Sequence, residues 1–260
     1  MKKILCLVLV LVMGLSMAAC SGKSKSDLDY VKEKGTLVVG ITEFAPMDYK
    51  DENGEWIGFD ADMATAFAES IGVEVEFVII DWDNKAFELD SKAIDCVWNG
   101  MTLTDEVKAT MDCSNAYCNN SQIVIVPAAD ADKYQTVESV KDLTFAVEAG
   151  SAGKKAVEAL KYEFVEVAAQ ADALMEVKAG TSDAAVIDAL MAAAMVGEGT
   201  SYEDLTYTVG LCDEQYGVGF RKGSDLCDEL NKFFVDSYKD GSMIECAKTY
   251  KIQASLIEQK

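Results

Sequence analysis

Short apolar runs alternate with stretches of helical periodicity along the first half of the chain. The predicted strands are 36–41, 73–80 and 94–98, and the predicted helices are 59–71, 83–91 and 104–110. The apolar residues of 59–71 fall on one helical face and stop at Gly72, which is typical of a helix C-terminus. Thr104 is placed to cap the helix that follows it.

A second series begins after a strand predicted over 122–126, which ends at Pro127. Its expected strands are 143–147, 163–167, 184–187, 205–209 and 216–220, and its expected helices are 136–141, 152–162, 171–179, 188–196, 224–239 and 242–250. Alternating strands and helices are typical of parallel α/β sheets. Because the series restarts, we expect two α/β lobes that face each other across a cleft. Ligands bind beyond the carboxyl ends of the strands in such sheets.

The first twenty residues have the pattern of an export signal. A basic start is followed by an apolar run over 4–15 and by Met17-Ala18-Ala19-Cys20. This predicts a signal peptide over 1–19, because the run is too short for a comfortable membrane span. The end of the run resembles a bacterial lipobox with Met17 in place of leucine, which implies cleavage before Cys20 and its lipidation. An ordinary signal peptide with an incidental cysteine is the alternative. We expect 20–29 to be a lipidated tether, since 21–26 is small and polar.

Charge and composition exclude several functions. The 260 residues include 23 basic and 45 acidic ones, a net charge of −22, so nucleic-acid binding is not expected. The chain has no histidine, which excludes Ser-His-Asp catalysis and His-based metal sites. Neither a metal nor a cofactor is expected. Beyond Cys20 there are six further cysteines in the body of the chain, at 96, 113, 118, 212, 227 and 246. Their even number allows disulfides but does not assign any. Cys96 is predicted to be a buried thiol.

Eight motifs carry a resemblance to a known family. They are FAPMDY (44–49), GFDADM (58–63), DWD (81–83), GMTLT (100–104), SNAY (114–117), GSAG (150–153), DAAVID (183–188) and YGVGFRKG (216–223). In this order they resemble the solute-binding proteins of polar amino-acid ABC importers, family 3, whose signature GFDxDL is similar to the second motif. The resemblance implies a type II two-lobed clamp with two crossover strands and a hinge near 121–124 and 213–217. Lobe I would hold 30–121 and 216–260, and lobe II 122–215.

The resemblance also implies a function. Such a protein captures an amino acid, or a related small polar amine, and delivers it to an ABC permease without chemistry of its own. We expect a monomer on the outer face of the bacterial cytoplasmic membrane, held by acyl chains such as palmitate on Cys20. The alternative is a dehydratase-like enzyme on the same scaffold. An enzyme needs a convergent acid and base, for which Glu43 and Asp188 are the candidates.

The family's binding positions can be matched in this sequence. Phe44 and Trp82 would enclose the ligand's side chain between aromatic faces. Asp188 matches the partner of the ligand's ammonium group, and it could also cap the following helix. The remaining matched residues are Asn99, Gly100 and Thr102, with amides and a hydroxyl for a carboxylate, and Ser151, Ala152 and Gly153, which open a helix or simply cap it. Glu43 lies where some members place an acid against a cationic side chain, although a solvated carboxylate is the preferred interpretation.

One position departs from the family pattern. The family's TxER segment supplies an arginine for the ligand's α-carboxylate, whereas Val107 stands at that place here. Either another donor replaces the arginine, or the ligand has no free α-carboxylate. Lys85, Lys108 and the amides of 151–153 are the candidate donors. The preferred hypothesis is an amino acid bound with Lys85, ahead of Lys108, as the substitute.

Overall fold

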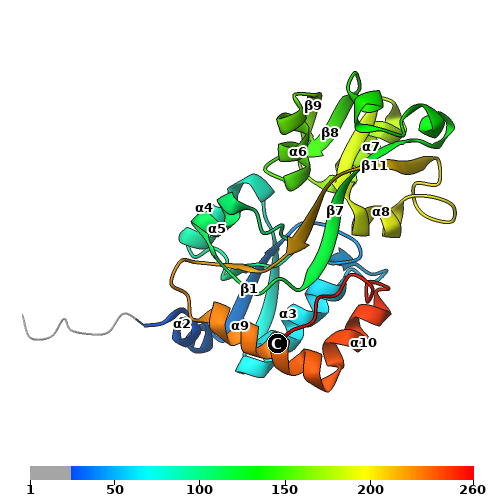
Figure 1. The fold of residues 1–260 in the computed structure, drawn as a ribbon. Coiled ribbons are helices and arrows are strands. Elements are labelled where there is room, and N and C mark those ends of the chain that lie inside the picture. The colour runs from blue at the N-terminus through cyan, green and yellow to red at the C-terminus, as the bar shows by residue number, and fades with distance from the viewer. Residues whose placement is uncertain (1–24) are drawn as a thin grey trace, which may run out of the picture.

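The computed structural model describes residues 25–260 and has two lobes, each built around a five-stranded sheet (Figure 1). In the first lobe the strand order is β4 (Glu74–Ile79), β1 (Thr36–Ile41), β5 (Cys96–Val97), β12 (Gly219–Phe220), β6 (Asp112–Cys113). In the second lobe it is β11 (Leu205–Tyr216), β7 (Cys118–Pro127), β10 (Ala184–Asp188), β8 (Thr144–Glu148), β9 (Glu163–Val167). The two-lobed α/β clamp expected from the sequence is confirmed.

Helices pack on both sheets. Those of the first lobe are α2 (Asp27–Lys34), α3 (Phe59–Ile71), α4 (Lys85–Asp90), α5 (Asp105–Thr110), α9 (Leu226–Asp240) and α10 (Ser242–Thr249). Those of the second lobe are α6 (Ala152–Leu160), α7 (Gln170–Ala179) and α8 (Ala189–Met195). Smaller elements are a hairpin of β2 (Tyr49–Lys50) and β3 (Trp56–Ile57), and 3-10 turns η1 (Trp82–Asn84), η2 (Ala128–Lys133) and η3 (Val137–Val140). The helix expected over 136–141 is thus the single 3-10 turn η3, and Thr104 caps α5 as predicted.

Two long strands, β7 and β11, join the lobes (Figure 1). They run antiparallel to each other, and β7 pairs with β10 in the second lobe. At their other ends, Cys118 bridges to Leu256 and Tyr216 bridges to Thr102 in the first lobe. The two predicted crossover strands are therefore present. The residue limits of the lobes and of the hinge remain predictions.

Two expectations about local structure were wrong. The sheets are mixed rather than parallel: β1 pairs in parallel with β4 and β5, whereas β12 runs antiparallel to β5 and β6. The reason is that β12 re-enters the first lobe after the second crossover, so its direction is set by that return. The tether was expected to reach residue 29, but α2 begins at Asp27, because the Ser26 side chain accepts a hydrogen bond from the Asp29 amide.

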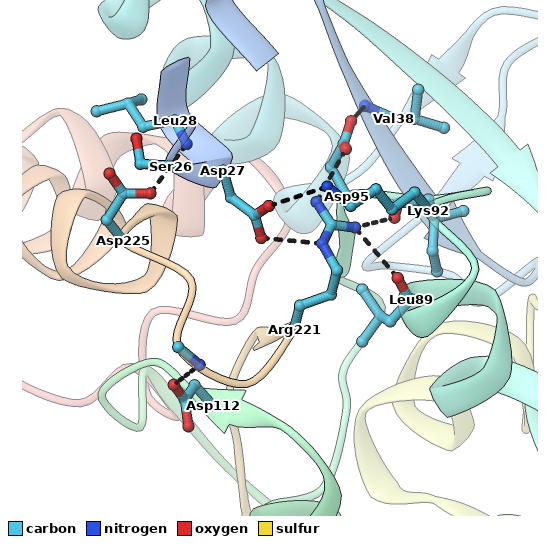
Figure 2. Close-up of polar contacts among 12 residues, drawn as sticks. Ser26, Asp27, Leu28, Val38, Leu89, Lys92, Asp95, Asp112, Arg221 and Asp225 are labelled. Carbon is cyan, nitrogen blue, oxygen red and sulfur yellow. Dashed lines mark hydrogen bonds and ion pairs between the residues drawn. The ribbon is translucent and has the colours of Figure 1, made fainter. Parts of the chain in front are cut away.

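A buried charge cluster fixes α2 to the first sheet (Figure 2). Arg221 Nε lies 2.9 Å from Asp27 Oδ2, Nη1 donates to the Ile94 carbonyl at 2.7 Å, and Nη2 lies 3.3 Å from Asp95 Oδ1. Lys34 Nζ donates to the other oxygen of Asp95 at 2.6 Å. We call these five residues the Arg221 cluster. Each charge in it has an oppositely charged partner, which offsets the cost of removing it from water.

The cysteines of the body are free thiols in the described residues, at 96, 113, 118, 212, 227 and 246. Cys96 is fully buried, as predicted. Over residues 25–260 no helix is long and apolar enough to span a membrane. Cys20 and the signal peptide expected over 1–19 lie outside the described residues.

Candidate functional site

A cleft lies between the lobes, with a hollow of about 430 Å³ that includes its solvent-open part. Predicted residues that line it are Phe44, Trp82, Lys85, Asn99, Gly100, Thr102, Ser151, Ala152 and Asp188. Gly153, Glu43 and Lys108 do not line it. Val107 does, together with four polar residues that the sequence analysis missed: Gln122, Glu148, Lys155 and Gln170. Several lining residues follow or end parallel strands (β1, β4, β8 and β10), where ligands of such sheets bind.

The two predicted aromatic side chains are buried and packed against neighbouring residues. Phe44 is 2% exposed and packs edge-on against Tyr216, with ring centroids 6.2 Å apart. Gly100 beneath it has a φ of +54°, and a Cβ there would come within 2.4 Å of the Phe44 ring, so a glycine is required for both reasons. Trp82, from η1, is 7% exposed and has the Lys85 ammonium 4.8 Å from its ring centroid.

Two of the predicted hydrogen-bonding groups are occupied within the protein. The Asn99 side-chain amide accepts from the Thr42 amide and hydroxyl, and it donates to the Thr42 carbonyl and, at 2.7 Å, to Asp48 Oδ2. The Gly100 amide donates to Asp60 Oδ2 at 2.7 Å. These groups hold the cleft floor together instead of offering free donors. The Thr102 N–H and hydroxyl, by contrast, have no partner among residues 25–260.

Asp188 forms a buried acidic end of the cleft. Its carboxylate accepts hydrogen bonds from four neutral groups: the Asn120, Gln122 and Gln170 side-chain amides and the Tyr216 hydroxyl. Asp188 occupies the N-cap position of α8, as the other interpretation had it, but its side chain makes no capping hydrogen bond. Burial, with the neighbouring Glu214 carboxyl, raises the pKa of Asp188 well above its usual value. An ammonium group bound here would supply the cation that the carboxylate lacks.

The N-terminus of α6 faces the cleft from the second lobe. Ser151 caps it, since its Oγ accepts from the Lys154 amide at 3.0 Å. The Ala152 and Gly153 amides make no hydrogen bond within the described chain. Gly153 itself packs behind the lining, where a Cβ would lie 2.8 Å from Gln122 Oε1. Free amides at a helix N-terminus favour an anion.

Two lysines reach this end of the cleft from opposite lobes. Lys85 Nζ donates to the Trp82 carbonyl at 2.9 Å and, across the cleft, to the Gly150 carbonyl at 3.2 Å. Burial and the nearby Lys155 ammonium lower the pKa of Lys85 to about 8. Lys155, on α6, pairs with Glu106 on α5 and so links the lobes a second time. Lys108 is exposed outside the cleft, which leaves Lys85 as the predicted lysine in reach of a ligand.

Glu148 ends β8 and lies at the cleft with only 3% of its surface exposed. Its Oε1 has no hydrogen-bond partner. Burial raises the pKa of Glu148 to about 8, against the opposing effects of the Lys85 ammonium and the Gln170 side-chain amide. The sequence carried a signal for it, because an acidic residue closes an otherwise apolar buried strand. Glu43, the acidic residue at which some family members bind a cationic side chain, is exposed to solvent, in agreement with the preferred interpretation of a solvated carboxylate.

The sequence matches the model of the bacterial extracellular solute-binding proteins, family 3, over residues 37–253. The chain belongs to this family. The arginine-binding extracellular protein ArtP of Bacillus subtilis is 28% identical over 259 residues, 96% of this chain and 98% of ArtP. The L-cystine-binding protein TcyJ of Escherichia coli is 29% identical, over 89% of this chain and 90% of TcyJ. A substrate-binding protein of a Streptococcus pneumoniae ABC uptake transporter, solved with bound histidine, has a TM-score of 0.79 at 30% identity, covering 88% of this chain and 97% of that one.

One relative that matches in part is an enzyme. Cyclohexadienyl dehydratase of Pseudomonas aeruginosa is 28% identical over 129 residues, 49% of this chain and 48% of the enzyme. ArtP and TcyJ, which match along nearly their whole length, are binding proteins. The acid and base suggested for an enzyme, Glu43 and Asp188, do not converge, because Glu43 is exposed outside the cleft lining. The dehydratase alternative is therefore not favoured.

Proposed function

We propose that this protein is the binding component of an ABC importer and captures an amino acid outside the cytoplasm. The observation that carries the proposal is the charge pattern of the cleft. An acidic end at Asp188 and a cationic end at Lys85 and the α6 N-terminus lie in one hollow with two aromatic rings. An α-amino acid carries one ammonium and one carboxylate on the same carbon, so it complements both ends.

The bound ligand would lie with its ammonium on Asp188 and its carboxylate at the α6 N-terminus. The Ala152 and Gly153 amides and the Thr102 N–H are unpaired donors for that carboxylate. Lys85, which uses two N–H groups on carbonyls, has a third for the ligand. This set replaces the arginine whose place Val107 takes, and Phe44 and Trp82 would hold the ligand's side chain between them.

The test is calorimetry against amino acids and their decarboxylated amines. Wild-type protein should bind at least one amino acid and reject the matching amine. Lys85→Met should weaken amino-acid binding by about 2 kcal/mol, the scale of a hydrogen bond to a charged group, whereas Lys108→Met should leave it unchanged. Amine binding without amino-acid binding would show that the amino-acid assignment is wrong. Mass spectrometry of the bound small molecule distinguishes an intact ligand from an altered product, which would indicate an enzyme.

We also propose that lipid on Cys20 holds the protein, as a monomer, at the outer face of the cytoplasmic membrane. The small residues before Cys20 and the short polar stretch after it support this. More than one acyl chain is needed for lasting attachment. Cys20→Ala should move the protein from the membrane fraction to the medium. Unchanged membrane retention of that variant would contradict the anchor and leave the binding function untouched.

A further inference from the structure

Unpaired polar atoms point to one residue in the cleft. Eight buried side-chain nitrogen or oxygen atoms in residues 25–260 have no hydrogen-bond partner. They belong to Asp48, Asp60, Trp98, Glu148, Ser182, Thr208, Glu214 and Ser224. Of these eight residues, Glu148 is the one that lines the cleft. A buried carboxyl oxygen without a partner is costly, and a ligand that supplies a donor there removes the cost.

When an amino acid is bound in the proposed pose, Glu148 is left without an oppositely charged partner. In the proposed pose the ligand's ammonium is neutralised by Asp188 and its carboxylate by Lys85 and the α6 amides. Lys155 already pairs with Glu106. Glu148 then keeps a negative charge, or a proton, that neither α-group of the ligand satisfies.

The charged groups around Glu148 add to this imbalance. Lys85 approaches it from α4, Asp81 from the loop before η1, and Asp172 from α7. Among the charged groups with the largest effect on Glu148, Lys85 is a cation and Asp81 and Asp172 are carboxyls, and the ligand's carboxylate would engage Lys85. An anionic side chain would be repelled here, and a neutral one would leave Glu148 Oε1 unpaired.

We propose that Glu148 determines specificity and selects an amino acid with a cationic side chain, an ammonium or a guanidinium. The inference rests on the proposed function and gives its ligand class. The side chain would pass between Phe44 and Trp82 and end at Glu148, a buried acidic group that the sequence analysis did not name. Aromatic faces next to the cation add to the attraction.

The experiment compares ligands that differ only in side-chain charge. Arginine is paired with citrulline, and lysine with norleucine, by calorimetry on the whole protein. Wild type should bind each cationic ligand at least tenfold more tightly than its neutral counterpart. Glu148→Gln should bring the ratio close to one, Glu148→Asp should keep part of it, and Glu43→Gln should leave it unchanged. Thermal unfolding of each variant verifies that it folds.

A pH series gives an independent readout. Because the pKa of Glu148 is raised to about 8, a cationic side chain must displace a proton from it below that pH. The arginine-to-citrulline affinity ratio should therefore rise from pH 6 to pH 8, by up to about tenfold per unit, and then level off. Titration of Lys85 or Asp188 affects the α-groups that both ligands share, so it cancels in the ratio. The ratio should not depend on pH in Glu148→Gln.

The outcomes separate this inference from the function on which it rests. If wild type binds citrulline or norleucine as tightly as its cationic partner, or if Glu148→Gln retains the ratio, the inference is wrong and amino-acid binding stands. If no amino acid binds, the proposed function fails and this inference fails with it.

Discussion

Two buried aspartates in the first lobe have opposite environments. Asp95, in the Arg221 cluster, is within 3.3 Å of the Arg221 guanidinium (Figure 2). It is also 2.6 Å from Lys34 Nζ. Asp60, beneath the cleft floor, accepts from the Tyr117 hydroxyl and the Gly100 amide, both at 2.7 Å, and its Oδ1 has no partner. Both side chains are fully buried. Burial raises the pKa of Asp60 to about 7, with neutral donors alone opposing the shift.

This difference in environment distinguishes a region that stabilises the fold, the Arg221 cluster, from a region that is suited to bind a ligand, the cleft. The Arg221 cluster holds oppositely charged groups together, and none of its residues lines the cleft. Around the cleft, Asp48, Asp60, Glu148 and Asp188 are all buried, and the pKa of each is raised, first of all by that burial. Such uncompensated groups lower stability, and functional sites are where proteins tolerate that cost.

Removal of the central cation should have the largest effect on stability. Arg221→Met leaves Asp27 and Asp95 buried without it, and we expect a loss of about 3–5 kcal/mol in the free energy of unfolding. Urea unfolding measures this. The neighbouring Lys222→Met is the control: its side chain is half exposed and its Nζ lies 3.3 Å from Asp112, so the loss should stay within about 1 kcal/mol. Equal losses would show that the cluster is no stronger than a surface pair.

The Arg221 cluster also marks a limit of the sequence analysis. Helical spacing and a terminal glycine placed α3 at 59–71 correctly, because these are local signals. The helix α2 has a single fully buried residue, Val31, so its sequence has little periodicity to detect. What holds it is the contact of Asp27 with Arg221, residues 194 positions apart. The mixed strand directions were missed for a similar reason, since long-range pairing sets them.

The cleft shows the same division between local and long-range information. Motif positions brought Phe44, Trp82 and Asp188 to the cleft, as expected. Asn99 also matched a family binding position, yet the hydrogen bonds of its side chain are made to other residues of the protein. The packing of the strand ends determines these partners, and a motif does not show it. Glu148 was missed because it belongs to none of the matched motifs. Its place at the end of an apolar strand is a signal of burial, but only the packing shows that its Oε1 has no partner.

Neutralising Asp60 should give the next largest effect, seen in the pH dependence of stability. The folded pKa is raised above the unfolded one, so the folded state holds an extra proton that it loses as pH rises through about 7. The contribution of Asp60 to stability should fall by about 2–3 kcal/mol between pH 5 and pH 8. Asp60→Asn should remove that part of the slope in urea unfolding at several pH values. An unchanged slope would mean that Asp60 is ionised in the fold at pH 5.

The smallest effect is expected for the ion pair that spans the cleft, Glu106–Lys155. Unlike the pairs of the Arg221 cluster, its side chains are 70% and 39% exposed, so solvent and salt screen it. Glu106→Gln should change the free energy of unfolding by less than about 1 kcal/mol. Because the pair joins the two lobes, its loss should favour an open clamp by a similar amount, which weakens ligand binding by up to about fivefold.

Solution scattering tests the same variant as a change of shape. Closure about β7 and β11 should reduce the radius of gyration at saturating ligand in both proteins. With less ligand, Glu106→Gln should be more expanded than wild type, and the difference should vanish at high salt, where the pair is screened. A tenfold or greater loss of affinity would show that an exposed pair at this cleft is worth as much as a buried one. In that case the different energetic effects of charged groups in the Arg221 cluster and at the cleft would come from their position in the clamp, and burial would not explain them.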